Sequence, residues 1–269
     1  MNTNVINNWT IGSDFELFLF NKQQNEVINA KPYVKGTKHK PFNFDKSSPF
    51  WCTSLDNISF EGNIAPCTTA NDFSNGIEKV ISYLKSNLPA DIIPIHDCAV
   101  RVSPKYLNTK EARTLGCEPT LNAYTLDENP RPSGETTNLR TCCTHVHLKF
   151  DGMDFATSVE WVKAMDLWLG MPSLLIEPSN ERRLLYGTLG EMRYCQTKTV
   201  EYRVLSSYFS GTRELREWVF NNTVKAIEWV NQGHRVTDEM SKSFQKAMID
   251  GDLNVASQLI SEFNISMPQ

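Results

Sequence analysis

The chain has 269 residues, of which 40% are hydrophobic, 10% aromatic and 22% charged. A disordered protein would not carry so many aromatic side chains, so the composition predicts a folded protein with a sizeable apolar core. With 27 basic and 31 acidic residues, the formal net charge is −4. We therefore expect no general attraction to nucleic acid.

The N-terminal residues, the apolar runs and the cysteines indicate the cellular compartment of the protein. Residues 1–8 lack the basic and apolar segments of a signal peptide, and no run of about 18 apolar residues indicates a membrane span. The seven cysteines are odd in number and include the adjacent pair Cys142 and Cys143, a poor disulfide framework for a chain of this size. These features predict a cytoplasmic protein with free thiols and no membrane partner.

Strand patterns occur through the first three quarters of the chain. Alternation of apolar and polar residues, with many β-branched and aromatic side chains, predicts strands at 10–20, 55–61, 92–102, 141–150 and 199–205. The polar segment 31–49, which contains several prolines, and the segment 116–132 are expected to be long loops.

Apolar residues at helical spacing predict helices over 73–84, 155–169, 215–230 and 253–263. Strands with interspersed helices come first and helices alone follow. This order favours an α+β fold with an antiparallel sheet over a parallel, doubly wound one. We expect one domain over residues 1–234 and a helical C-terminal appendage over 235–269.

Several common catalytic motifs are absent. The sequence has no phosphate-binding P-loop, no glycine-rich dinucleotide turn, no zincin helix, no nucleophile elbow and no cysteine pairs of zinc-ribbon spacing. The chemistry is therefore expected to come from side chains on strands.

Polar side chains occupy four predicted strands at positions where packing residues are usual. They are Asp14 with Glu16, Glu61, His145 with His147, and Glu201 with Arg203. The two members of a pair are two residues apart and so share one face of a strand. If the strands are neighbours at about 4.8 Å, the groups form one cluster. Clustered carboxylates need cations, and oxygen ligands with an imidazole suit Mg²⁺ or Mn²⁺.

Arginines accompany these pairs in the sequence: Arg140, Arg182, Arg183, Arg193 and Arg203. Guanidinium groups beside divalent cations suit polyphosphate binding and phosphoryl transfer. Residue chemistry alone thus predicts a nucleotide–metal site on a sheet face. Taken singly, each pair has a commoner explanation, such as a solvated sheet face, a hydrogen-bonded histidine pair or an ordinary cross-strand ion pair. The order of the whole set is the informative feature.

This order resembles the carboxylate–amine ligases of the glutamine synthetase-like superfamily, and most closely the amidoligase-type proteins of tailed bacteriophages. The resemblance extends from about Gly12 to Trp229. It rests on six short segments, at 12–16, 56–66, 116–119, 140–147, 185–193 and 200–206.

The resemblance implies a curved antiparallel sheet that holds ATP and two divalent ions, Mg²⁺ or Mn²⁺. It also implies the reaction: a carboxylate of a small molecule or peptide takes the γ-phosphate of ATP, and an amine then displaces phosphate to form an amide. A phage-encoded protein of this kind would act in the host cytoplasm.

The resemblance also implies roles for particular residues. Asp14 and Glu16 match an acidic pair with one member on each metal, Glu61 matches a ligand of the first metal, and His145 and Glu201 match ligands of the second. His147 would lie nearer to the acyl substrate or the phosphate. Arg193 and Arg203 match catalytic arginines on the phosphate and the carboxylate, and Arg140 a nucleotide-binding one.

Two alternatives stay open. Cys142 and Cys143 stand where the family often has two glycines, which leaves room for a degenerate, non-catalytic binding module. A cupin-like metal enzyme would use the two histidines with one glutamate, and would require a later histidine such as His234.

Overall fold

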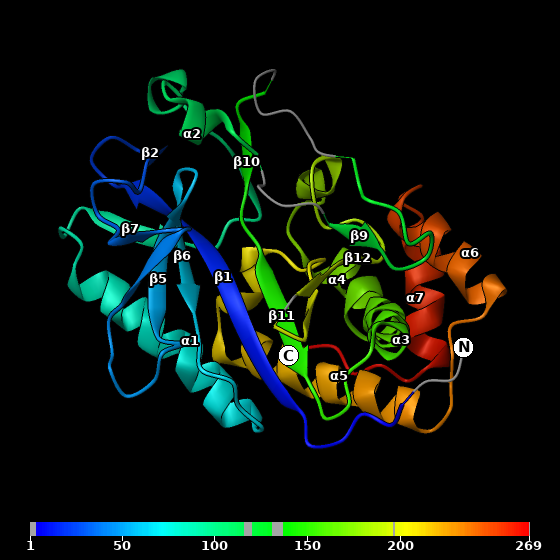
Figure 1. Cartoon of the computed structure of the whole chain (residues 1–269). Coiled ribbons are helices and arrows are strands. Elements are labelled where there is room, and N and C mark those ends of the chain that lie inside the picture. Colours follow the sequence, from blue (N-terminus) through cyan, green and yellow to red (C-terminus); the bar gives the residue numbers. More distant parts are fainter. Residues whose placement is uncertain (1–3, 116–119, 131–136, 196, 269) are drawn as a thin grey trace.

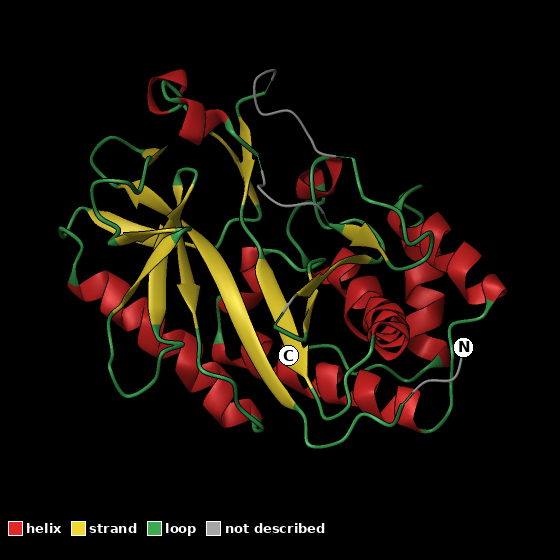
Figure 2. Ribbon diagram, in the orientation of Figure 1, coloured by secondary structure: helices red, strands yellow, loops and turns green. Residues whose placement is uncertain are grey.

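The computed structural model describes residues 4–115, 120–130, 137–195 and 197–268. A large, mostly antiparallel sheet of eleven strands runs through this part of the chain, and helices cover one of its faces (Figures 1 and 2). The predicted α+β class, with an antiparallel sheet, flanking helices and C-terminal helices, is confirmed.

The centre of the sheet holds the strands predicted to carry the chemistry. Its middle order is β6-β1-β11-β13, formed by β6 (Ser59–Asn63), β1 (Thr10–Asn21), β11 (Thr144–Lys149) and β13 (Thr199–Tyr202). The outer strands are β3 (Gly36–Thr37), β4 (Lys40–Asn43) and β5 (Cys52–Asp56) on one side, and β12 (Glu191–Cys195) and β9 (Leu121–Asn122) on the other. The far end of β1 pairs with β2 (Glu26–Ile28) and β7 (Ile92–Ile95).

Alternation along β1 separates an apolar face from a polar one. Phe15 and Leu17 are fully buried, whereas Asp14 and Glu16, which alternate with them, are half-buried on the other face. The apolar face packs beneath α1 (Ala70–Ser86), α3 (Phe155–Met165) and α5 (Arg213–Asn231). Gly62 marks a close approach, because a Cβ there would lie 2.4 Å from the Val80 side chain of α1.

The C-terminal helices are α6 (Asp238–Met248) and α7 (Leu253–Glu262), and α4 (Met171–Ile176) packs against both. Phe244 and Ala256 belong to the same apolar cluster as β1. The indole of Trp218 donates a hydrogen bond to the carbonyl of Ser266 at 2.6 Å. The proposed division into residues 1–234 and 235–269 stays a prediction.

Several element boundaries differ from the predictions. The expected strand 55–61 is a hairpin, because Asn57 adopts a left-handed conformation (φ 56°) and turns the chain between β5 and β6. The expected strand 92–102 divides into β7 and β8 (Ala99–Arg101), and β8 pairs with β10 (Leu139–Thr141) in a separate sheet.

The remaining differences concern a loop and two connections. The segment 31–49 contains the edge strands β3 and β4, and a short helix, α2 (Lys110–Arg113), lies further along the chain. Helix α3 continues into a π-helical turn (Asp166–Gly170) and then α4, because Pro172 lies in the first turn of α4, where its missing N–H costs little. The expected loop 116–132 lies partly outside the described residues.

Candidate active site

The sheet register brings the predicted residues together. Asp14 lies opposite His145, and Glu16 lies opposite Glu61. His147 and Glu201 are opposite each other on β11 and β13. All five strand-borne metal-ligand candidates and His147 therefore lie on neighbouring strands.

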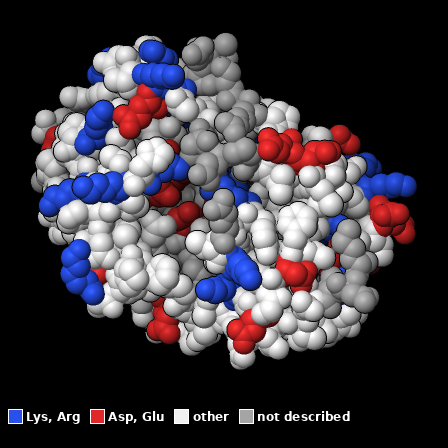
Figure 3. Space-filling model, viewed as in Figure 1, with Lys and Arg blue, Asp and Glu red and all other residues white. Residues whose placement is uncertain are grey.

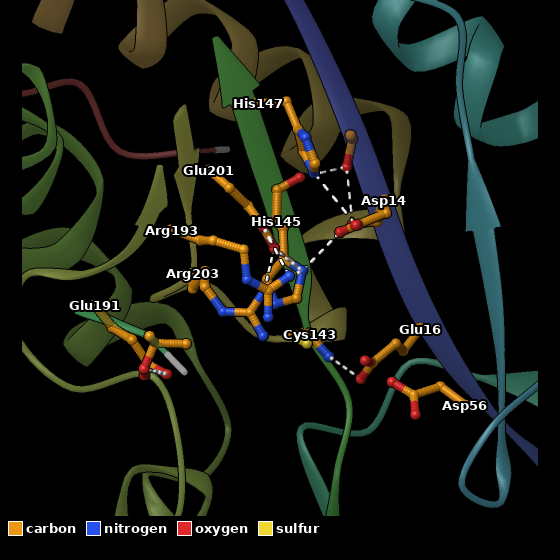
Figure 4. A network of polar contacts seen from close by, with 12 residues as sticks. Asp14, Glu16, Asp56, Cys143, His145, His147, Glu191, Arg193, Glu201 and Arg203 are labelled. Atoms are coloured by element: carbon orange, nitrogen blue, oxygen red, sulfur yellow. Dashed lines mark hydrogen bonds and ion pairs between the residues drawn. The ribbon is translucent and has the colours of Figure 1, made fainter. Parts of the chain in front are cut away.

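The centre of the site is a contact between carboxylates and imidazoles (Figure 4). Nδ1 of His145 lies 2.6 Å from Oδ1 of Asp14 and 2.9 Å from Oε1 of Glu201. Nε2 of His147 is buried and lies 3.3 Å from Oδ2 of Asp14, within ion-pair distance. One ligand atom from each of Asp14, His147 and Glu201 lies within 4.8 Å of the others, a spacing that could hold a metal ion.

Two arginines neutralise Glu201. Arg193 Nη1 lies 3.2 Å from Oε2 of Glu201, and Arg203 forms an ion pair with Oε1. The Glu201 side chain is only 2% exposed. Burial alone would raise its pKa, but Arg203 and His145 outweigh burial and hold the pKa of Glu201 far below its usual range.

The same balance governs Asp14. Burial would raise the pKa of Asp14, but the charges and hydrogen bonds of His145 and His147 hold it well below the usual range. In return, burial would lower the pKa of both imidazoles, and the carboxylates Asp14 and Glu201 raise it instead. At this end of the site, the negative charges already have positive partners within the chain.

A second group of carboxyls, here called the acid end, consists of Glu16, Glu61 and Asp56. Glu16 accepts a hydrogen bond from the backbone N–H of Cys143 at 3.1 Å, and Glu61 accepts one from the Ser54 hydroxyl at 2.9 Å. Burial and the neighbouring Asp56 raise the pKa of Glu16. Burial, Asp14 and Asp56 raise the pKa of Glu61 to about 8.

The sequence interpretation gave no role to three residues at this site. Asp56 is the last residue of β5 and lies at the start of the hairpin turn to β6. The ammonium group of Lys38 lies 3.3 Å from its carboxylate. Glu191 is 3% exposed and accepts hydrogen bonds from the N–H groups of Gly187 (2.6 Å) and Thr188. Asp56 and Glu191 lie in two of the segments that carry the family resemblance, so the sequence could have indicated both as site residues.

Three of the predicted arginines use their guanidinium groups elsewhere. Arg140 donates hydrogen bonds to the carbonyls of Ala112, Thr137 and Leu139, at 2.7 to 3.2 Å. Arg182 donates to the carbonyl of Val204 at 2.8 Å, and Arg183 pairs with a buried carboxylate, Glu177, at 3.1 Å. Arg140 still lines the site. Its hydrogen bonds go to backbone carbonyls, and its nucleotide-binding role stays a prediction.

The central cluster lies between two hollows. The first, here called the arginine hollow, is lined by charged side chains that include Glu16, Lys38, Asp56, Arg182, Glu191 and Arg203. The second, here called the His147 hollow, has a volume of about 350 Å³ and a largely apolar wall formed by residues such as Phe50, Ile64, Pro66, His147 and Thr199. Figure 3 shows acidic side chains inside a central depression with basic side chains at its border.

The cysteines and the late histidine contribute little to the ligand set. Burial and Glu16 raise the pKa of Cys143 to about 11, so its thiol is neutral near pH 7. Cys142 is fully buried in an apolar cluster with Phe18. His234 stacks on Trp229, with ring centres 5.4 Å apart, and the metal-capable group found among the described residues does not include it. The cupin-like alternative therefore gains no support.

Residues 135–266 match the model of the family described as "Phage phiEco32-like COOH.NH2 ligase-type 2". This part of the chain, just under half of its residues, is thus similar to a family of carboxylate–amine ligases, and the resemblance inferred from the sequence is confirmed.

No curated protein matches the sequence. Among solved structures, the chain is similar to a bifunctional glutathione synthetase from Pasteurella multocida, with 8% identity and a TM-score of 0.46. The match covers 95% of this chain and 49% of the synthetase, so the chain spans about half of that protein's length. In the described part of the chain, every helix is too short or too polar to cross a bilayer.

Proposed function

We propose that the protein is an ATP-dependent ligase that joins a carboxylate to an amine through an acyl phosphate, with two divalent cations in the site. The observation that carries this proposal is the central cluster, in which Asp14, His147 and Glu201 offer ligand atoms within 4.8 Å and two arginines stand beside them.

The donor set fits Mg²⁺ or Mn²⁺. Carboxylate oxygens with imidazole nitrogen are the ligands these ions accept, and the chain offers no thiolate at this point because Cys143 stays protonated. Asp14, Glu201 and the imidazoles of His145 and His147 would surround one ion, and Glu16 and Glu61 would hold the other. When bound, such ions polarise phosphoryl oxygens and neutralise the charge that develops on them.

The side chains of the protein would then position the reactants. Arg203 and Arg193 would hold the γ-phosphoryl group and the attacking carboxylate in line, since planar guanidinium groups bind both kinds of oxyanion. In the first step, a carboxylate oxygen bonds to the γ-phosphorus and the bond to the ADP oxygen breaks. In the second, the amine nitrogen bonds to the acyl carbon, inorganic phosphate leaves, and the amine proton passes to solvent or to a basic side chain.

The two hollows suit two different reactants. The apolar wall of the His147 hollow, with its hydroxyl groups, is suited to a flat heterocyclic base, and its polar end reaches His147. The arginine hollow offers Arg203 and Lys38 to a carboxylate. ATP and the carboxylate would therefore approach the cluster from opposite sides.

The test is nucleotide-dependent phosphate release. Purified protein with ATP, Mg²⁺ and a panel of amino acids and peptides should form ADP, inorganic phosphate and an amide product that mass spectrometry can identify. Glu16→Gln should lose turnover, and Glu228→Gln, on an exposed helical pair, is the matched control. Absence of nucleotide binding at millimolar Mg²⁺ would refute the proposal, and biological activity preserved in Glu16→Gln would favour a non-catalytic binding module.

A further inference from the structure

A buried carboxyl group lies on the other side of β13 from the site. Asp166, at the start of the π-helical turn, has no exposed surface. Its Oδ1 accepts a hydrogen bond from the hydroxyl of Tyr202 at 2.9 Å, and its Oδ2 accepts one from the hydroxyl of Tyr124 at 3.0 Å. The reaction proposed above makes no use of this group.

Tyr202 connects Asp166 to the site through the backbone. It follows Glu201 directly, so the two side chains point to opposite faces of β13. Tyr202 is fully buried, and its ring meets Trp161 of α3 edge-on with ring centres 6.5 Å apart. A displacement of the backbone at Tyr202 would therefore move Glu201 as well.

The end of β13 is a point where such a support matters. The strand has four residues and ends at Tyr202, which pairs with Val146 and Met192. Arg203, the next residue, donates its backbone N–H to the carbonyl of Glu191 at 3.0 Å, and its own carbonyl accepts a hydrogen bond from Arg182 at 3.2 Å. A short strand has few ladder bonds, so a side-chain anchor at its last residue limits motion of both neighbours.

The π-helical turn is shaped for this contact. A Cβ at Gly170 would lie 2.9 Å from the Tyr202 hydroxyl oxygen and 3.2 Å from Oδ1 of Asp166. Glycine leaves the space in which the hydroxyl reaches the carboxyl. π-Helical turns are rare and are found frequently at functional sites.

We propose that Asp166 is a positioning residue of the ligase site: its hydrogen bond to Tyr202 fixes the end of β13 and thereby orients Glu201 and Arg203. This inference rests on the proposed function, because it assigns Glu201 to metal binding. Burial raises the pKa of Asp166 to about 7, although the hydrogen bonds from both tyrosines lower it.

The test compares two tyrosines that bind the same carboxyl. Tyr202→Phe and Tyr124→Phe each remove one hydroxyl, with bonds of nearly equal length, but only Tyr202 adjoins Glu201. Mn²⁺ binding, followed by electron paramagnetic resonance at fixed pH, is the readout, and thermal unfolding is measured in parallel. Loss of a residue that supports a metal ligand weakens metal binding about tenfold or more.

We expect Tyr202→Phe and Asp166→Asn to raise the Kd for Mn²⁺ about tenfold, and Tyr124→Phe to raise it less than about twofold. The two tyrosine variants should lower the melting temperature by similar amounts. Gly170→Ala, which displaces the Tyr202 hydroxyl without removing a polar group, should weaken binding in the same direction. If Asp166→Asn does not fold, the tyrosine pair decides the question.

Two results would overturn the inference, and they can be told apart. Equal Mn²⁺ affinities in Tyr202→Phe and Tyr124→Phe, with normal binding by the unmodified protein, would mean that the network only stabilises the fold. Failure of the unmodified protein to bind Mn²⁺ would refute the proposed function, and this inference with it.

Discussion

The two ends of the acidic cluster, one with Asp14 and Glu201 and the other with Glu16, Glu61 and Asp56, differ in how their negative charges are compensated. Asp14 is half-buried and Glu201 is buried, and the chain supplies two imidazoles and two guanidinium groups within ion-pair distance of them. At the acid end, Glu16 and Glu61 are half-buried, and burial together with neighbouring carboxyl groups raises their pKa.

This difference indicates where an external cation has most to contribute. A buried carboxylate without a compensating charge costs several kcal/mol, whereas one with partners does not. A divalent ion bound at the acid end would supply the missing charge, while one at the other end must compete with the arginines. Four substitutions test this contrast.

Glu201→Gln should have the largest effect. It leaves His145, Arg193 and Arg203 without their carboxylate, and breaking a buried pair of this kind costs about 3–5 kcal/mol. We expect that loss in chemical unfolding and a fall in ADP formation of about 1000-fold or more. The surface variant Glu228→Gln should change neither stability nor ADP formation. Near-normal stability of Glu201→Gln would contradict the interpretation that the cations around Glu201 depend on its charge.

Asp166 provides a reference for this contrast, because its buried carboxyl is bonded to hydroxyl groups and not to cations, and Asp166→Asn tests it. Its pKa is raised to about 7, whereas in the unfolded chain it loses its proton near pH 4. The folded state thus binds the extra proton between these values, so stability falls as pH rises from about 4 to about 7, by about 4 kcal/mol.

In unfolding measured across this range, the fall should disappear in Asp166→Asn and persist in Asp250→Asn, which alters an exposed carboxyl. Parallel pH profiles of the unmodified protein and Asp166→Asn would show that the buried group titrates normally.

Glu61→Gln should have the opposite sign to Glu201→Gln. Removing one negative charge from the acid end relieves repulsion from Asp14 and Asp56, so the metal-free protein in EDTA should gain about 1–3 kcal/mol near pH 8. The same variant should lose much of the rise in melting temperature that Mg²⁺ produces. A loss of stability in EDTA would mean that Glu61 already has sufficient compensation within the chain.

Lys38→Met should have the smallest effect. The ammonium group pairs with Asp56 at the edge of the acid end and is partly exposed, so its loss should cost under about 1 kcal/mol. Because the acid end then carries more net negative charge, Mg²⁺ should bind about twofold to threefold more tightly in calorimetry. Lys40→Met in the same hairpin is the control, and weaker Mg²⁺ binding in Lys38→Met would indicate that Lys38 helps to place the ligands.

The features that the sequence predicted well depend on strand periodicity. Pairs such as Asp14 with Glu16 and His145 with His147 share a face because side chains alternate along a strand, whatever the tertiary fold. The same regularity allowed the α+β class and the central strands to be predicted.

The features that escaped prediction depend on single backbone conformations and long-range contacts. Asn57 turns the chain within an alternating segment, and this turn brings Asp56 to the site. Arg140 was expected to bind the nucleotide, but its guanidinium group donates to the carbonyl of Ala112, which only the fold brings near. The Asp166 network requires a π-helical turn, which apolar spacing does not distinguish from an α-helix.

The position of β1 has a consequence for protein production. This strand lies between β6 and β11, and it carries Asp14 and Glu16, whereas the region matching the family begins only at residue 135. A polypeptide cut to that region would leave the N–H and C=O groups along one side of β11 without partners, and such open edges favour intermolecular pairing and aggregation. Truncation at the family boundary should therefore yield insoluble material in place of a smaller enzyme.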